Sequence, residues 1–430
     1  MISIAEVTIW NKKVGAVAYD TEKGEGSFEF ENSFLATNWD LCPIKMPLSV
    51  AKGKIFSFPE LKNSQTFKGM PGLLADVLPD KYGNALINAW LARNGRPAGS
   101  LNPVEILCFI GKRGMGALEF SPVQPKSYDT QTKININDLV QVAEAILTNR
   151  TIFSANLSTD DERAITDILK IGTSAGGARA KAIIAFNPIT KEVRSGQTAA
   201  APGFEHWLIK FDGVQDQQFG VSNGYGRVEM AYYEMAKDCA IEMMESRLLE
   251  ENGRAHFMTK RFDRPTEKEK LHVQTFCALM HYDFNEVGIY SYEQIFELMR
   301  LLNLPYPQQE QLYRRMVFNV MARNCDDHSK NFAFVMHQTG EWKLSPAYDI
   351  CHAYRPGSTW VSQHSLRING KRQNITREDL LETASNMNIK KAKQIIDQVS
   401  DVVNHWNDYA DQQKVDPILK NAIGKTLLNL

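Results

Sequence analysis

The chain has 430 residues and a formal net charge of −1, from 49 Lys and Arg against 50 Asp and Glu. Hydrophobic residues make up 43% of it and charged residues 23%, which excludes a mostly disordered chain. The near-zero net charge argues against a protein that coats nucleic acid, because such a protein needs an excess of basic residues. No apolar run reaches the roughly 18 residues of a membrane-spanning helix, and the first residues lack a signal-peptide pattern. Six scattered cysteines without a C-x-x-C pair predict a reducing cytoplasm and no zinc site.

Residues 1–125 are predicted to form a β-rich N-terminal subdomain. Apolar and polar residues alternate through the first part of it, as in Val7–Trp10 and Val14–Tyr19, which indicates short antiparallel strands. Turn residues then open two helical stretches, at 71–72 and at 102–103. A polar, proline-interrupted run around residue 125 marks the end of this subdomain.

Residues 126–265 mix helix and strand patterns, and residues 266–430 are mainly helical. In the middle part the spacing predicts helices over 136–147 and 228–241 and strands over 182–186, 206–211, 246–249 and 256–262. In the last part it predicts helices over 292–303, 309–323, 377–386 and 390–408. One hairpin interrupts them, with strands at 331–337 and 341–344 around a turn at 338–340. A mixed part followed by a helical part is the lobe order of a protein kinase.

A glycine-rich loop, Gly-Thr-Ser-Ala-Gly-Gly at 172–177, is the first of three features that suggest chemistry. Glycines let backbone N–H groups approach phosphate oxygens closely. The gap between Gly172 and Gly177 matches a Walker A loop, but Ala178 stands where that loop has lysine, so this is not one. A plain tight turn is an equally good interpretation of the loop taken alone.

The second feature is Lys210, which lies in the apolar strand sequence 207–211. A lysine there is costly unless its ammonium group has a partner. Protein kinases use a strand lysine to hold the α- and β-phosphates of ATP and pair it with a helix glutamate. Glu229 opens the next predicted helix and is the candidate for that pair, with Glu234 as a second candidate. An edge-strand lysine that faces water is the alternative.

The third and strongest feature is the sequence Asp-Asp-His-Ser-Lys-Asn at 326–331, followed by Asp349. Asp326 and Asn331 have the D-x-x-x-x-N spacing of a kinase catalytic loop. Phosphoryl transfer needs a carboxylate to take the proton of the acceptor hydroxyl, and Asp326 can supply it. It also needs oxygen ligands for Mg²⁺, which Asn331 and Asp349 can supply. We expect the hairpin to bring Asp349 back beside Asn331. The alternative is a polar turn after a helix.

Together these features resemble the HipA family, the Ser/Thr kinase toxins of bacterial toxin–antitoxin modules, over nearly the full length of the chain. The motifs that carry the resemblance are 72–80, Gly-Met-Gly-Ala-Leu-Glu-Phe at 114–120, Ser-Ala-Gly-Gly-Ala-Arg-Ala-Lys at 174–181, Arg-Phe-Asp-Arg at 261–264, Asp326–Asn331, Ser-Pro-Ala-Tyr-Asp at 345–349 and Ile-Asn-Gly-Lys at 368–371. The resemblance implies an α+β, bilobal, protein-kinase-like fold. It would have an added β-rich subdomain (1–125), a kinase N-lobe-like part with the glycine-rich loop (126–265) and a helical C-terminal lobe with the catalytic loop and metal site (266–430).

The resemblance also implies roles for single residues. Asp326 would be the catalytic base, and Asn331 and Asp349 would bind Mg²⁺. The residues expected to bind ATP, with Lys260 and Phe262 acting through the backbone at the adenine, are Gly172, Thr173, Ser174, Ala175, Gly176, Gly177, Lys181, Lys210, Lys260, Phe262 and Lys330. Ser174 aligns with the serine that HipA kinases autophosphorylate. A phosphate there would add about −1.5 to −2 charge to a loop that holds the phosphates of ATP, so we expect it to eject the loop and inactivate the enzyme.

Two positions near Asp326 call for separate interpretation. Asp327 stands where the best-known family members have glycine, and we expect this second carboxylate to add a metal contact or to raise the pKa of its neighbour. Cys325 is either a redox-sensitive thiol or a buried spacer, and the spacer is the better interpretation of the two.

The function implied by the resemblance is an ATP- and Mg²⁺-dependent serine/threonine protein kinase that acts as the toxin of a type II toxin–antitoxin system. Such toxins phosphorylate aminoacyl-tRNA synthetases, which arrests growth and leads to persistence. They pair with a small helix-turn-helix antitoxin of HipB type. The balanced charge of the chain fits an arrangement in which the antitoxin makes most of the DNA contacts. No membrane partner is expected. Two alternatives stay open: a kinase of a small molecule or other acceptor, and a non-catalytic corepressor partner of a DNA-binding antitoxin.

Overall fold

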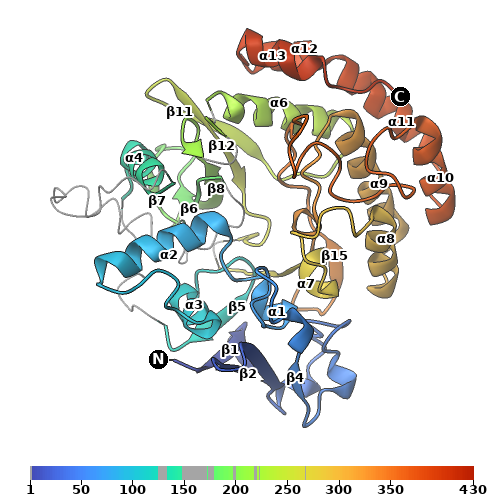
Figure 1. Cartoon of the computed structure of the whole chain (residues 1–430). Helices are drawn as coiled ribbons and strands as arrows, with labels where there is room; N and C mark the ends of the chain where they lie inside the picture. The colour runs from blue at the N-terminus through green and yellow to red at the C-terminus, as the bar shows by residue number, and fades with distance from the viewer. Residues whose placement is uncertain are drawn as a thin grey trace. The chain divides into compact units, whose positions relative to one another are not determined.

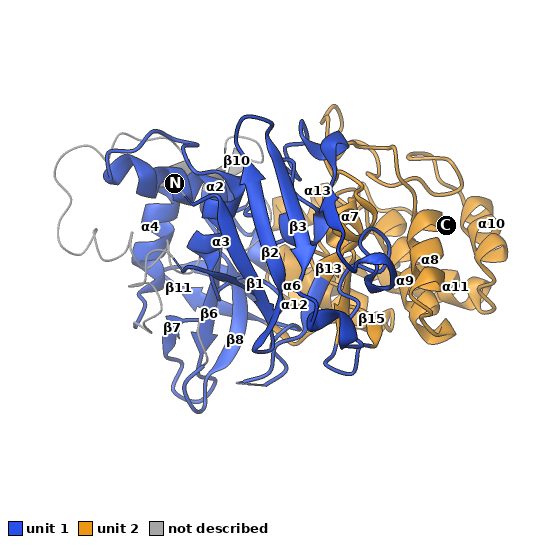
Figure 2. Cartoon of the chain, turned by 90° about the horizontal axis from the view of Figure 1, so that it is seen from below, with its two compact units in different colours: residues 1–226, 247–273, 337–340 blue, residues 227–246, 274–336, 341–430 orange. Residues whose placement is uncertain are grey.

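The computed structural model describes residues 2–123, 133–147, 172, 179–196, 200–216, 220–221, 223–266 and 268–430 (Figure 1). They fall into two compact units, which Figure 2 distinguishes by colour. The first unit comprises Met1–Gly226, Arg247–Val273 and His337–Gly340, and the second comprises Arg227–Ser246, Gln274–Met336 and Glu341–Leu430. Within the described residues, no helix has the length and apolar character needed to cross a membrane.

The first unit begins with an antiparallel sheet in the order β4-β3-β2-β1-β5. Its strands are β1 (Ile4–Ile9), β2 (Lys12–Asp20), β3 (Glu25–Phe30), β4 (Ile55–Ser57) and β5 (Leu118–Ser121). Trp10 and Asn11 join β1 to β2 with φ of 46° and 62°, the positive values that suit the twist of a two-residue hairpin turn. The predicted alternation holds in β1, where every second side chain is buried.

Helices α1 (Gly72–Ala75), α2 (Lys81–Arg93) and α3 (Pro103–Ile110) follow the first four strands. Asn102 caps α3 in a capping box with Glu105, which explains why the helix begins at the Asn-Pro pair. Helix α3 packs against β1, β2 and β5. The β-rich N-terminal subdomain predicted from the alternation is therefore present, with these helices added to it.

A second sheet of the first unit has the order β11-β12-β8-β6-β7. Its strands are β6 (Lys181–Phe186), β7 (Val193–Ser195), β8 (Glu205–Lys210), β11 (Ser246–Glu251) and β12 (Arg254–Lys260). The same unit contains a separate two-stranded pair, β9 (Gln215–Asp216) and β10 (Gly220–Val221), and helix α4 (Ile136–Leu147). Tyr82 and Leu86 of α2 belong to the same hydrophobic core as Trp207 and Ile209 of β8. This core extends across the boundary predicted near residue 125, and the three-part division of the chain stays a prediction.

The second unit is mainly helical. Its elements are α6 (Tyr225–Asp238), α7 (Phe276–Met280), α8 (Tyr292–Leu301), α9 (Tyr306–Met321), α10 (Arg377–Met387), α11 (Ala392–Asn404), α12 (Trp406–Gln412), α13 (Pro417–Gly424) and the strands β13 (His272–Thr275), β14 (Ala333–Met336) and β15 (Trp342–Leu344). Helix α9 packs against α8 and α11, and nine of its side chains are buried, including Arg315 and Asn319. Helices α8 and α10 each begin with a capping box, at Ser291 and Thr376.

The prediction of a single helix over 390–408 is wrong. The structure has two helices there, because α11 ends at Asn404 and α12 begins at Trp406. Between them, the ring of His405 hydrogen-bonds with its Nδ1 to the carbonyl of Asp401 at 2.8 Å, and its N–H bonds to Val402 rather than to the residue four positions back. Trp406 is buried at the start of the new helix. The apolar periodicity continues across this break, so the sequence pattern did not show it.

Candidate active site

The segment that carries Asp326 starts where α9 ends. Arg323 adopts a φ of 56°, a left-handed conformation that ends the helical run. The N–H of Cys325 then donates to the carbonyl of Ala353 at 3.0 Å, and the N–H of Ala353 donates to the carbonyl of Arg323 at 3.1 Å. The loop is thereby fixed to the segment that follows Asp349.

Strands β14 and β15 return the chain from Asn331 toward Asp349. They pair antiparallel with Phe334 opposite Leu344, as the hairpin pattern predicted. The Tyr348 hydroxyl donates to the carbonyl of Lys330 at 2.6 Å. The neighbours of Asn331 and Asp349 in the sequence are therefore in contact, which is the return of the chain expected from the sequence.

The Asp326 side chain is 42% exposed, and the ring of His328 lies near it, with Nε2 3.9 Å from Oδ1. The Asn331 side chain is oriented by its own loop, because its Nδ2 donates to the backbone carbonyl of Asp326 at 2.6 Å. This bond leaves the Asn331 Oδ1 to face another ligand. The loop thus holds an accessible carboxylate that can take a proton, beside an amide oxygen that can bind a cation.

Asn331 and Asp349 fit what Mg²⁺ requires of a kinase site. Mg²⁺ binds oxygen ligands and commonly takes only one or two from the protein, with phosphate oxygens and water completing its shell. Asp349 has a φ of 52°, and its carbonyl accepts a hydrogen bond from Asn324 at 3.4 Å, so its backbone conformation is held from the α9 side. Among the residues that the structure describes, no three His, Cys, Asp or Glu side chains form a metal-holding group.

Asp327 does not join this group. Its side chain is 1% exposed, and its carboxylate accepts hydrogen bonds from the hydroxyl of Tyr292 (2.9 Å), from Nδ1 of His364 (2.9 Å) and from the N–H of Ser365 (2.7 Å). Of the two expectations for Asp327, the metal contact is therefore wrong, and an effect on its neighbour Asp326 stays a prediction. Burial alone would lower the pKa of His364, but the Asp327 carboxylate outweighs burial and raises that pKa to about 10.

Sequence reasoning missed His364 and Tyr292, because each lies more than 30 positions from Asp327 and neither stands in a spaced motif. Cys325 is completely buried, with its Sγ 3.9 Å from Nε2 of His364, as a spacer in the core would be. Lys330 lies with its Nζ 4.9 Å from the ring centroid of Phe284.

The residues expected to hold ATP phosphates are only partly within the described residues. Thr173, Ser174, Ala175, Gly176 and Gly177 lie outside them. Gly172 is buried, and a Cβ at this position would lie 2.5 Å from Cδ1 of Leu86 in α2. A side chain here would therefore require Leu86 to move.

Lys181 and Lys210 are brought together by the second sheet. Lys181 opens β6 and Lys210 closes β8, and the two are directly opposite each other in the antiparallel register. Opposed residues project to the same face of a sheet. Lys181 is 4% exposed, and the Nζ of Lys210 lies 5.8 Å from the ring centroid of Phe257 on β12. Two ammonium groups are thus directed to one face at the ends of neighbouring strands.

The predicted adenine-binding segment at Lys260–Phe262 follows β12. The side chain of Lys260 is paired with Glu205 at 2.7 Å, and the N–H of Arg261 donates to the carbonyl of His206 at 2.9 Å. Contact of the backbone at Lys260 and Phe262 with adenine stays a prediction. In the second unit, Glu229 is buried on α6, and its pairing with a lysine stays a prediction.

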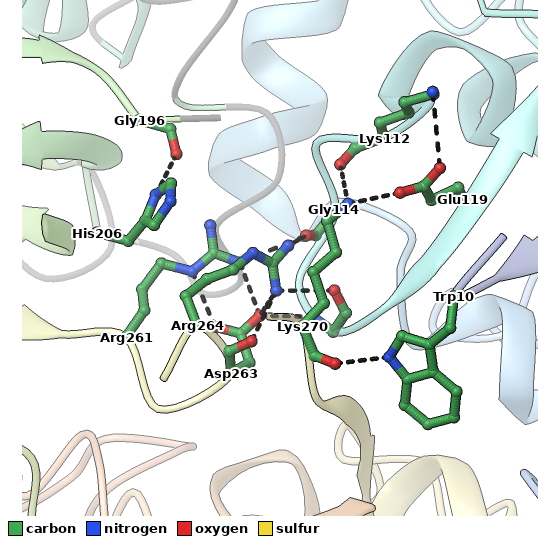
Figure 3. Close-up of polar contacts among 11 residues, drawn as sticks. Trp10, Lys112, Gly114, Glu119, Gly196, His206, Arg261, Asp263, Arg264 and Lys270 are labelled. Carbon is green, nitrogen blue, oxygen red and sulfur yellow. Dashed lines mark hydrogen bonds and ion pairs between the residues drawn. The ribbon is translucent and has the colours of Figure 1, made fainter. Parts of the chain in front are cut away.

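Beyond this segment lies a buried cluster of charges that the sequence did not suggest (Figure 3). Asp263 is fully buried and accepts hydrogen bonds from Arg261, from Arg264 and from the N–H of Gly116, all at 2.7 to 2.9 Å. Arg264 also donates to the carbonyl oxygens of Gly114 (3.1 Å) and Gly116 (2.9 Å). The Arg-Phe-Asp-Arg motif is thus tied to the glycine motif of the N-terminal subdomain.

The surroundings of this cluster are electropositive. Burial opposes ionisation of Asp263, but Arg261 and Arg264 outweigh it and lower the pKa of that carboxyl group. Burial and then the charge of Arg261 lower the pKa of Arg264 to about 10. Burial and the same two arginines lower the pKa of His206 to about 4, so this histidine is neutral at physiological pH. Lys270 is paired with Glu119 at 2.7 Å at the edge of the cluster.

Comparison with known proteins gives two family matches. The model of the HipA N-terminal domain matches residues 5–121, and the model of the HipA-like C-terminal domain matches residues 173–406, which is more than half of the chain. The chain belongs to the HipA family. The loop at 326–331, the segment of Asp349, and both Lys181 and Lys210 lie inside the HipA-like C-terminal match.

Individual relatives are distant. A protein of Haemophilus influenzae named "Putative kinase" is 25% identical over 135 residues, which cover 28% of this chain and 39% of that protein. "Putative kinase Y4mE" of Sinorhizobium fredii is 27% identical over 108 residues, which cover 23% of this chain and 26% of that protein. This HipA-family chain therefore matches well under half of the length of either curated relative.

A solved structure shows the fold. A chain in the complex of the HipA, HipB toxin–antitoxin system with its operator DNA from Shewanella oneidensis MR-1 matches with a TM-score of 0.68. The match covers 98% of this chain and 94% of that one, at 15% identity. The predicted α+β, kinase-like HipA fold, with a β-rich N-terminal subdomain and a mainly helical C-terminal lobe, is confirmed.

Proposed function

We propose that this HipA-family chain is an ATP- and Mg²⁺-dependent serine/threonine protein kinase. The observation that carries the proposal is the loop at 326–331. It presents an accessible carboxylate at Asp326, orients the oxygen of Asn331, and is tied through Tyr348 to the segment of Asp349. This is the set of groups that transfer of the γ-phosphoryl group of ATP to a hydroxyl requires.

Each residue has a role in this transfer. Asp326 accepts the proton of the attacking hydroxyl group, so that its oxygen can form the new bond to the γ-phosphorus while the bond to the β–γ bridging oxygen breaks and ADP leaves. Asn331 and Asp349 supply oxygen ligands to Mg²⁺, which when bound neutralises charge on the phosphates. Lys181 and Lys210 are assigned to the phosphates of ATP, because two opposed ammonium groups favour a polyanion between them. Glu229 is assigned to the pairing of Lys210.

The family and the name of the structural relative support a place in a toxin–antitoxin pair. We propose a helix-turn-helix antitoxin of HipB type as the partner, with DNA bound mainly through that antitoxin. As protein substrate we propose an aminoacyl-tRNA synthetase, whose phosphorylation would arrest growth. Autophosphorylation at Ser174 would then switch the kinase off by adding negative charge to the loop that binds ATP.

The experiment is a phosphoryl-transfer assay with Mg²⁺ and γ-labelled ATP, with a panel of aminoacyl-tRNA synthetases as acceptors. The wild type is compared with Asp326→Asn and with Asp408→Asn, a control at an exposed position on α12. Labelling of an acceptor by the wild type and the control, but not by Asp326→Asn, is expected. Labelling that survives Asp326→Asn would contradict the proposed base. Self-labelling without labelling of any synthetase would leave a kinase for another acceptor.

A further inference from the structure

A buried network of hydrogen bonds surrounds Asp327, the residue next to the proposed base. Asp327 has a full set of partners in Tyr292, His364 and the N–H of Ser365. A buried carboxylate is tolerated only when it is paired and hydrogen-bonded, and all three bonds are of normal length. Three partners therefore satisfy the Asp327 carboxylate within the protein interior.

The network continues from Tyr292 to the segment of the proposed metal ligand. The hydroxyl of Tyr292 accepts a hydrogen bond from Nδ2 of Asn319 at 3.0 Å. The Oδ1 of Asn319 accepts one from Nδ2 of Asn324 at 2.9 Å, and the same Nδ2 donates to the carbonyl of Asp349 at 3.4 Å. An unbroken series of side-chain hydrogen bonds thus joins Asp327 to the backbone at Asp349.

On its other side the network is fixed by the segment that carries His364. The N–H of His364 donates to the carbonyl of Arg372 at 3.0 Å, and Nε of Arg372 donates back to the carbonyl of His364 at 2.7 Å. The hydroxyl of Ser365 donates to the carbonyl of Cys325 at 3.3 Å. The backbone on the N-terminal side of Asp326 is therefore held by the same segment that holds Asp327.

We propose that Asp327 is a positioning residue for phosphoryl transfer, acting with His364 and Tyr292. Its side chain is fixed in the interior, and the adjacent Asp326 side chain stays accessible. The network then fixes the Asp326 loop and the Asp349 backbone relative to each other. This inference rests on the proposed function, and it assigns to Asp327 a role other than metal binding.

The effect of the network falls on the chemical step. The geometry of a base and of the attacking oxygen matters most in the transition state, where a misplacement of about 1 Å can cost on the order of 10²-fold in rate. Binding of ATP in the ground state depends less on that geometry. Loss of the network should therefore lower kcat and leave KM for ATP nearly unchanged.

Three variants test this. Asp327→Asn keeps the volume of the side chain but replaces one carboxylate oxygen by an NH₂ group, which faces hydrogen-bond donors. His364→Gln removes the imidazole ring that bonds to Asp327, and Tyr292→Phe removes a single hydroxyl group. The matched control is Asp379→Asn, because Asp379 is equally buried in the same unit but bonds to Lys371, Asn369 and Thr376 outside the network. Steady-state kinetics are measured at a temperature where every variant is folded by circular dichroism.

We expect Asp327→Asn to lower kcat on the order of 10²-fold with KM for ATP within about twofold of the wild type. Tyr292→Phe should lower kcat by a smaller factor. The double variant Asp327→Asn/His364→Gln should have the same kcat as Asp327→Asn alone, because Asp327 and His364 act as one unit. Asp379→Asn should lose thermal stability and keep kcat.

The inference is overturned if Asp327→Asn, or Tyr292→Phe where the former does not fold, keeps the kcat of Asp379→Asn. That outcome, with transfer still abolished by Asp326→Asn, would leave the proposed function intact. A wild type that transfers no phosphate to itself or to any acceptor would instead overturn the proposed function, and this inference with it.

Discussion

Lys181 and Lys210 lie directly opposite each other on neighbouring antiparallel strands of the second sheet. Like charges in this relationship normally destabilise a sheet, because the two side chains project to the same face. Lys181 is also almost fully buried. An anion bound at these strand ends would offset this repulsion, and in our proposal that anion is the triphosphate of ATP.

We predict that Lys210→Met weakens ATP binding by about 10- to 100-fold, the loss of one charge-assisted contact of about 1.5–3 kcal/mol. The control is Lys191→Met, at an exposed position in the turn between β6 and β7. The measurement is the rise in melting temperature with increasing Mg·ATP, from which the Kd follows by linkage. Equal ATP responses of the two variants would contradict a phosphate-binding role for Lys210.

The buried cluster at Asp263 should matter for folding. Asp263→Asn leaves Arg261 and Arg264 buried without their counter-charge, so we predict a loss of about 3–5 kcal/mol in the free energy of unfolding. Glu6→Gln is the control, because the Glu6–Lys13 pair is 45% exposed on both sides and should change stability by less than about 0.5 kcal/mol. Urea unfolding measures both. Equal midpoints would show that the cluster is not stabilising.

The Asp327–His364 pair predicts a pH dependence of stability. The pKa of His364 is raised in the folded protein to about 10, above the value near 6.5 expected in the unfolded chain. The folded state therefore holds this proton more tightly, and the stabilisation is fully present below pH ~6.5 and is lost as the pH rises toward about 10. The Asp327 carboxylate acts on this histidine, the thiol of Cys325 lies against its ring, and Arg372 lies near the same carboxylate.

The measurement is the free energy of unfolding of the wild type and of His364→Gln between pH 6 and pH 10. The wild type should lose its advantage over the variant progressively through this window, because the variant has no proton to lose at this position. A difference between the two proteins that is constant across the window would contradict the charged pair.

Much of the fold was predictable, because local patterns decided it. The helix predicted over 136–147 has those bounds, and the hairpin that returns the chain to Asp349 forms where the turn at 338–340 indicated. The spacing of Asp326 and Asn331 likewise placed both residues in one loop, where the Asn331 side chain donates to the carbonyl of Asp326.

The rest depended on contacts between residues far apart in the chain. Asp327 was predicted either to contact a metal or to act on its neighbour Asp326, yet its partners Tyr292 and His364 come from α8 and from the segment after β15. The bond between Asp263 and the N–H of Gly116 spans 147 positions. The sequence marks these residues as polar but carries no local signal of which are buried together.

Intact-mass spectrometry of the purified protein before and after incubation with Mg·ATP shows whether the chain transfers phosphate with Asp326 as the base. Wild type and Asp326→Asn are treated alike, and the modified residue is mapped by peptide analysis. We expect a gain of one phosphate at Ser174 in the wild type and none in the variant. The same gain in Asp326→Asn, or a wild type that phosphorylates neither itself nor any acceptor, would contradict this expectation.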